Sequence, residues 1–190
     1  MADVRRYNAV AMSLHWLIAA LILTNIGLAW YFGTLHGSAK VPPVQIHKSI
    51  GMTVLVLSLA RLAWRFISPP PPLPASMPAW ERWAAHTVHA LLYLIMIGMP
   101  LTGWAMSSAS QLIRVYPITW FGLFQIPAIA PLTTLPAVQM KSAHHLYLSL
   151  HELGAKLAYV LIVGHVLAAL RHQFLKNDQV LWRMVPGRSA

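Results

Sequence analysis

Hydrophobic residues are gathered along the chain into four long runs, which are separated by polar or proline-rich segments. The runs cover residues 9–32, 44–66, 83–106 and about 146–170. Each run would measure roughly 35 Å as an α-helix, which is enough to cross a bilayer with some tilt. Tryptophans near the ends of the runs match the aromatic residues that gather at membrane interfaces. The pattern predicts an all-α integral membrane protein folded as a four-helix bundle.

The segments between the runs contain no further membrane span. Residues 68–78 are rich in proline, which predicts a stiff, extended surface loop. Residues 107–141 are longer and partly apolar, but the prolines that recur in them would break a long helix. We therefore expect this segment to lie on the bundle as a cap. No internal repeat is visible, so we expect residues 1–190 to form a single membrane domain.

The composition supports a membrane protein and excludes several other classes. Apolar residues make up 57% of the 190 residues and charged residues only 9%, against about 25% charged in ordinary globular domains. Disordered chains are polar or highly charged, so disorder is excluded. The net charge of +10 comes mostly from basic residues that lie between the apolar runs, so no nucleic-acid partner is expected. The absence of cysteine excludes disulfides, Cys-ligated iron–sulfur clusters and the Cys-x-x-Cys-His attachment of c-type haem.

The distribution of the basic residues predicts the orientation of the bundle. With four spans, both termini lie on the same side of the membrane. Nine basic residues are on that side: Arg5, Arg6, Arg61, Arg65, Arg82, Arg171, Lys176, Arg183 and Arg188. Four are on the other side: Lys40, Lys48, Arg114 and Lys141. The positive-inside rule then places both termini in the cytoplasm.

Histidines occur in every apolar run, and a histidine within a membrane span is a functional-site hypothesis by default. From the predicted topology, His15 and His165 lie toward the cytoplasmic side, whereas His47 and His151 lie near the outer side. His151 and His165 are 14 residues apart, which places them within about 40° of one helix face and about 21 Å apart along the axis. Depth therefore pairs His47 with His151 and His15 with His165.

This pairing is the geometry of two stacked cofactors, each held by two imidazoles. Neutral imidazole is a good iron ligand, and a haem fills the apolar space between the helices of a bundle. Two other interpretations remain open, namely a different metal or proton pathway and simple polar contacts between helices. His86 and His89 lie at about the depth of His15 and could replace a member of the inner pair, or serve a propionate, a quinone or a proton path.

Five segments resemble the bacterial cytochrome b561 family, in the four-helix diheme type that includes superoxide oxidase. They are RRYNAVAMSLHWL, HKSIGMTVLVLSLARLAWR, HTVHALLYLIMIGMPLTGWAM, PITWFGLFQIP and LHELGAKLAYVLIVGHVLAALRHQF. Together they cover nearly the whole chain apart from the proline-rich loop and parts of the cap.

The resemblance implies two haem b groups with His15, His47, His151 and His165 as axial ligands. It also implies a ubiquinone site near the cytoplasmic haem, where the histidine of ALRHQF, His172, matches the family motif. The implied protein is lipid-embedded in the bacterial inner membrane. It would pass electrons from superoxide or another outer donor to ubiquinone. No catalytic side chain is assigned.

Two alternatives to a stand-alone superoxide oxidase remain. The chain could be the cytochrome b anchor subunit of a hydrogenase- or dehydrogenase-type respiratory complex, which would connect a peripheral partner to quinone. It could also be a histidine-lined proton or metal transporter, which would show no haem spectrum.

Overall fold

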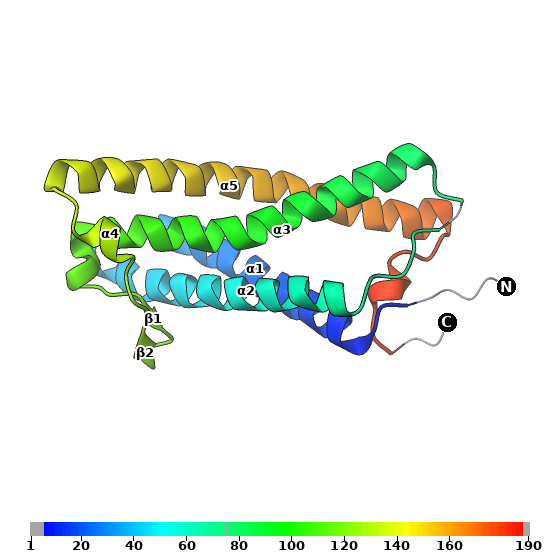
Figure 1. Ribbon diagram of the computed structural model, residues 1–190, viewed down its shortest axis with the longest axis horizontal. Coiled ribbons are helices and arrows are strands. Elements are labelled where there is room, and N and C mark those ends of the chain that lie inside the picture. Colours follow the sequence, from blue (N-terminus) through cyan, green and yellow to red (C-terminus); the bar gives the residue numbers. More distant parts are fainter. Residues whose placement is uncertain (1–5, 75, 188–190) are drawn as a thin grey trace.

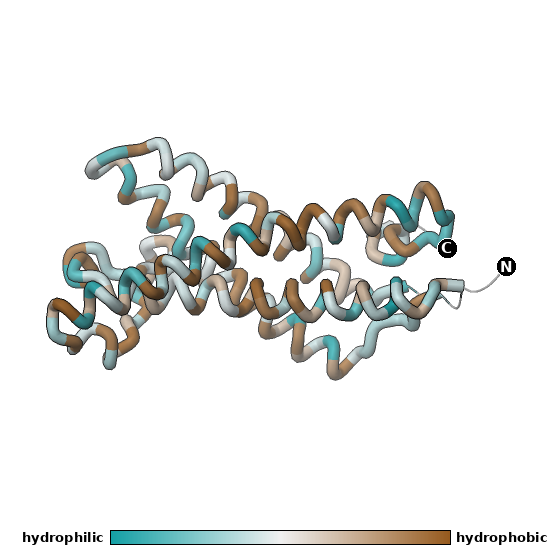
Figure 2. Tube along the Cα trace, turned by 90° about the horizontal axis from the view of Figure 1, so that it is seen from above, coloured by the Kyte–Doolittle hydropathy of each residue, from teal (hydrophilic) through white to brown (hydrophobic). Residues whose placement is uncertain are grey.

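The computed structural model describes residues 6–74 and 76–187. Four long helices alternate in direction along the bundle (Figure 1), and each is long and apolar enough to cross a membrane. They are α1 (Ala9–Gly33), α2 (Val41–Ile67), α3 (Ala79–Ser108) and α5 (Ala137–Arg171). Figure 2 shows hydrophobic residues along the middle of the bundle and more hydrophilic segments toward both ends. The predicted all-α membrane bundle is confirmed.

Short elements occupy the two ends of the bundle (Figure 1). They are η1 (Gly37–Lys40), η2 (Gln111–Arg114), β1 (Thr119–Trp120), β2 (Phe124–Gln125), α4 (Ala130–Thr133), the π-turn η3 (His172–Lys176) and η4 (Trp182–Met184). The strands β1 and β2 form an antiparallel hairpin in which Trp120 pairs with Phe124. We call the end that carries residues 109–136 the cap end. The other end, which carries residues 6–8, 68–74 and 172–187, is the terminal end.

Local sequence signals set the starts of the helices. The Asn8 side chain caps α1 by accepting a hydrogen bond from the Ala11 amide at 2.9 Å, which satisfies one of the free N–H groups of the first turn. Prolines stand at the start of α2, where a missing N–H costs nothing. The helix α5 begins at Ala137, nine residues before the expected apolar run. Its first turns are more polar than the run, so the hydropathy pattern did not include them.

The helices do not all pack equally closely. The helix α1 packs on α2, α2 packs on α3, and α3 packs along α5, whereas α5 hardly approaches the backbones of α1 and α2. A small apolar core of Ile18, Ile50 and Val54 joins α1 and α2. Side chains must therefore bridge the space between α5 and the α1–α2 pair, and the predicted histidines lie on the helices that border it.

The cap is fastened to α2 by buried hydrogen bonds. The Ser49 hydroxyl accepts from the Phe121 amide at 2.9 Å and lies 2.9 Å from the Thr119 carbonyl oxygen. The Trp120 indole N–H donates to the Thr53 hydroxyl at 3.0 Å. Because the Ser49 side chain is buried, its two bonds to the cap are partly shielded from water. The expected cap over residues 107–141 therefore lies against the bundle, and no fifth long helix forms there.

The terminal end is also tied together by hydrogen bonds. The Tyr7 amide donates to the Arg183 carbonyl oxygen at 3.2 Å, and the Trp16 indole donates to the Met184 carbonyl oxygen at 2.7 Å. The Arg183 guanidinium donates to the Pro72 carbonyl oxygen at 2.9 Å. The two ends of the described chain thus lie together, as four alternating spans require (Figure 1). Arg5 and Arg188, which entered the orientation prediction, lie outside the described residues.

Candidate functional site

At the cap end, His47 on α2 faces His151 on α5. Their ring centroids are 6.3 Å apart and the rings are inclined at 72°. Each Nδ1 atom lies beside a backbone carbonyl oxygen, that of Asn25 at 3.2 Å for His47 and that of Met99 at 3.1 Å for His151. A carbonyl accepts only, so each Nδ1–H donates and each Nε2 keeps a free lone pair. This is how proteins orient a metal-ligating histidine.

At the terminal end, His15 on α1 faces His165 on α5 with the same spacing. Their centroids are 6.3 Å apart and the rings are inclined at 68°. An imidazole nitrogen lies about 2 Å from a bound metal ion and about 1 Å from its own ring centre, so two rings on opposite sides of one ion have centroids about 6 Å apart. The spacing of both pairs therefore fits one metal ion between the rings.

A third histidine lies beside the pair at the terminal end. The His89 ring is 5.5 Å from the His165 ring, centroid to centroid, which is closer than His15 but short for a metal ion held between two rings. His86, in contrast, is exposed to the surroundings of the bundle. The sequence placed His86 and His89 on roughly one face of a helix, and in α3 they differ in exposure: His89 brings its ring against His165, whereas His86 is exposed.

The number of protein ligands distinguishes among metal centres. Within residues 6–74 and 76–187, no group of three or more His, Cys, Asp or Glu side chains could hold a metal ion. A zinc site draws at least three ligands from the protein. A haem iron needs only axial ligands, because the macrocycle supplies the other four nitrogens. Two imidazoles per site therefore fit haem.

Other features of the chain fit a haem at these positions. The backbones of α1 and α2 lie closer to each other than to α5. A Cβ atom added at Gly103 would lie 3.3 Å from the His151 ring, so glycine lets this ring take its place. Ser58 is fully buried, and its hydroxyl has no hydrogen-bond partner among the described residues. An unpaired buried hydroxyl is costly and indicates a missing polar partner.

The structure places His172, the predicted quinone residue, in a separate polar cluster at the terminal end. Its Nδ1 lies 2.5 Å from Asp178 Oδ2 and its Nε2 lies 3.7 Å from Glu81 Oε2. Glu81 is buried and also pairs with Lys176 at 2.7 Å and Arg171 at 3.1 Å. The sequence singled out His172 but missed Glu81 and Asp178, which give no recognisable motif.

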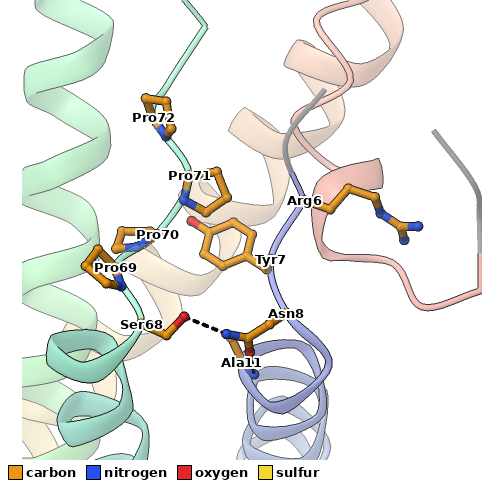
Figure 3. Close-up of a pocket in the computed structure, with 9 residues that line it drawn as sticks. All are labelled: Arg6, Tyr7, Asn8, Ala11, Ser68, Pro69, Pro70, Pro71 and Pro72. Atoms are coloured by element: carbon orange, nitrogen blue, oxygen red, sulfur yellow. Dashed lines mark hydrogen bonds between the residues drawn. The ribbon is translucent and has the colours of Figure 1, made fainter. Parts of the chain in front are cut away.

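A hollow of about 480 Å³ opens at the terminal end, between the start of α1 and the proline-rich loop (Figure 3). Two of the residues that line it are hydrogen-bonded to each other: the Asn8 side-chain amide donates to the Ser68 hydroxyl at 2.7 Å. The hollow is lined by Arg6, Tyr7, Asn8, Ala11, Ser68, Pro69, Pro70, Pro71 and Pro72. None of the five predicted site residues is among them.

Comparison with known proteins identifies the family. Residues 6–187 match the profile described as "Prokaryotic cytochrome b561". The chain is 34% identical to "Cytochrome b561 homolog 2" of Escherichia coli (strain K12), over 97% of this chain and 93% of that protein. It is 28% identical to "Probable superoxide oxidase CybB" of Yersinia pestis, over 97% and 98% of the two chains. It is 27% identical to "Cytochrome b562" of Cereibacter sphaeroides, over 96% of each.

These matches extend over all four long helices and both histidine pairs. The family relation implies haem binding and electron transport, which agrees with a bundle that presents imidazoles in pairs. Four apolar spans and a prokaryotic family indicate a multi-pass bacterial membrane protein. The chain belongs to the prokaryotic cytochrome b561 family.

Proposed function

We propose that this chain is a diheme cytochrome b that oxidises superoxide at the outer side of the bacterial inner membrane and reduces ubiquinone at the cytoplasmic side. The observation that carries the proposal is the presence of two histidine pairs near opposite ends of one bundle. In each pair the centroids of the two imidazole rings are 6.3 Å apart. A haem bound at each pair would supply a one-electron redox centre. The whole chain, residues 1–190, would act as one membrane domain.

The axial ligands would be His15 with His165 and His47 with His151. The carbonyl oxygens of Asn25 and Met99 orient the outer pair by holding Nδ1–H. We infer that the cap end faces the periplasm and the terminal end faces the cytoplasm. The side of the two termini has nine basic residues and the other side has four, and basic residues are in excess on the cytoplasmic side.

Superoxide as the donor is supported by the charge of the cap end. Lys48 follows His47 directly and is half-buried, and Lys40, Arg114 and Lys141 lie in or next to the same end. The acidic residue nearest to this pair is Glu152, which is exposed. A positive, low-dielectric rim raises the encounter rate of a small anion. The Yersinia pestis relative is named "Probable superoxide oxidase CybB", which also supports superoxide as the donor.

Ubiquinone would bind near His172 at the terminal end. Because Asp178 holds Nδ1, Nε2 is the ring nitrogen that can donate to a quinone carbonyl. Quinone reduction takes up protons, and imidazole exchanges protons near neutral pH. Asp178 would fix the orientation of the ring. Glu81 Oε2 lies 3.7 Å from Nε2, which is too long for a hydrogen bond and leaves that N–H to the quinone.

The first test is the reduced-minus-oxidised visible spectrum of the purified protein together with its haem content. We expect two low-spin b haems per chain, and one haem per chain would contradict the two-pair arrangement. The second test is superoxide-dependent reduction of ubiquinone by the protein in vesicles. Haem reduction by a co-purifying peripheral protein, with no response to superoxide, would instead assign the chain to the anchor-subunit class.

A further inference from the structure

Two arginines in α2, Arg61 and Arg65, have no acidic partner among the described residues. They are four residues apart, both half-buried, and they interact electrostatically with each other. Two like charges at this helical spacing repel, and a charge inside a membrane span is costly unless it is paired. An anion beside the pair would offset both costs.

None of the acidic side chains in the described part of the chain is paired with these arginines. Glu81 is bound by Lys176 and Arg171, and Asp178 is bound by His172. Glu152 follows His151 at the cap end of α5 and is exposed. The fourth acidic residue, Asp3, lies outside the described residues. The part of the chain that the structure describes, residues 6–74 and 76–187, thus holds no acidic counter-ion for the arginine pair.

The arginine pair lies beside the inner histidines. Arg61 interacts electrostatically with His15, His89 and His165, and its guanidinium carbon is 5.9 Å from the centre of the Tyr93 ring. Arg65 also interacts electrostatically with His89. Two cations without an acidic partner among the described residues therefore lie beside the inner pair.

We propose that Arg61 and Arg65 bind the two propionate carboxylates of the haem held between His15 and His165. The proposal rests on the proposed haem site. A haem b carries two carboxylates, which match two guanidinium groups in charge and number. Arginine binds carboxylates through two parallel hydrogen bonds, and such charge-assisted bonds are strong.

This arrangement fixes how the inner haem sits in the bundle. Arg65 is one helical turn closer than Arg61 to the terminal end of α2, so the propionate edge of the macrocycle faces that end and its apolar edge faces the membrane interior. The two cations also offset the negative charge of the carboxylates near the iron. Without them, that charge favours the oxidised iron, and the midpoint potential of the inner haem falls.

The test is a spectroelectrochemical titration of the full-length protein in phosphatidylcholine nanodiscs, for wild type, Arg61→Gln, Arg65→Gln and Arg61→Lys. The His47→Ala variant, which retains only the inner pair, identifies the inner midpoint. Arg82→Gln is the matched control, because Arg82 is exposed at the same end of the bundle. Resonance Raman spectra of the propionate modes give a second readout that is independent of activity.

We expect both Gln variants to lower the inner midpoint and shift the propionate modes, while the outer midpoint and the Arg82→Gln protein are unchanged. Arg61→Lys should shift less, because it keeps the charge. If Arg61→Gln loses the inner haem altogether, retention of that haem by Arg61→Lys supports the proposal and equal loss contradicts it.

Two results would overturn the assignment. One is an unchanged inner midpoint and unchanged propionate modes in both Gln variants. The other is a shift that appears only when phosphatidylglycerol replaces phosphatidylcholine, which would assign the arginines to a lipid phosphate. Failure of the underlying haem site is recognised separately, since wild-type protein would then lack the inner b-haem signal before any arginine is changed.

Discussion

The imidazole of His172 and the carboxylate of Asp178 are joined by a 2.5 Å contact between Nδ1 and Oδ2. The two residues stand at either end of a π-turn, and the backbone reverses after it through Asn177, which has a left-handed conformation. The turn thus brings a carboxylate back onto the histidine at the end of α5. The ring is buried, so its orientation depends on this carboxylate.

Replacing Asp178 by Asn should slow ubiquinone reduction and leave both haem spectra intact. A hydrogen bond to a charged group is worth about 1.5–3 kcal/mol, so we expect the rate of haem reoxidation by ubiquinone to fall on the order of tenfold. Stopped-flow reoxidation of pre-reduced protein measures this step. Asp178→Glu should recover most of the rate. An unchanged rate in both Asp178→Asn and His172→Ala would remove this cluster from the quinone site.

His15 and His89 compete for the role of ligand opposite His165, and alanine variants separate them. We expect His15→Ala to lose one low-spin haem signal, because the 6.3 Å spacing of its ring fits a metal ion between the two. His89→Ala should keep two haems with at most a shifted inner spectrum. The visible spectrum and the haem content of the two variants show which histidine is the ligand opposite His165. Loss of a haem in His89→Ala alone would reverse the assignment.

The orientation prediction places the C-terminus in the cytoplasm. A C-terminal fusion to green fluorescent protein should fluoresce, and a fusion to alkaline phosphatase should be inactive, because the phosphatase folds only after export. A fusion after residue 37, in the short turn at the cap end, should give the opposite pattern. An active phosphatase at the C-terminus would exchange the outer and inner haems in the proposed electron path.

Charge reversal at the cap end should slow the reaction with superoxide. Lys48→Glu and Lys141→Glu replace attraction of the anion by repulsion, so the second-order rate of haem reduction should fall while the spectra stay unchanged. The wild-type rate should also fall with salt, as the Debye length decreases from about 10 Å at 0.1 M to about 3 Å at 1 M. Pulse radiolysis measures both effects, with Arg82→Glu at the terminal end as control. A rate indifferent to charge and salt would exclude steering of superoxide at this face.

The cap depends on Ser49. In Ser49→Ala the Phe121 amide loses its partner, and an unsatisfied buried donor costs about 1–3 kcal/mol. We expect faster proteolysis within residues 117–127 and a lower Tm. Ser142→Ala is the control, because that exposed hydroxyl bonds only within its own helix, to the Val138 carbonyl oxygen. Equal protease resistance of the two variants would show that the cap is held by other contacts.

The sequence predicts the fold and the histidine depths well, for physical reasons. A span must be apolar over its whole length, so the four helices are visible in hydropathy, and helical rise then gives the level of each histidine. The helix boundaries are less visible. The polar turn at Ala137 and the amphipathic start at Ala79 continue their helices beyond the apolar zone.

The carboxylates that surround His172 could not be predicted from hydropathy and helical rise. Glu81 meets Lys176 and Arg171 only because the start of α3 and the end of α5 lie at one end of the bundle. Asp178 reaches His172 through a π-turn, which has no periodic signature. The charge count that set the orientation used Arg61 and Arg65 but could not place them beside the inner histidines, because that position depends on how α2 is rotated in the bundle.

The helix α5 carries one histidine of each pair, and it is the last of the four spans along the chain. Ribosomes release the chain from its N-terminus, so His15 and His47 enter the membrane while His151 and His165 have yet to be made. In the proposed assignment, neither iron can gain its second axial ligand until translation is almost complete. Cofactor insertion is thereby tied to the end of synthesis, and a truncated chain that lacks α5 would leave both sites half-liganded.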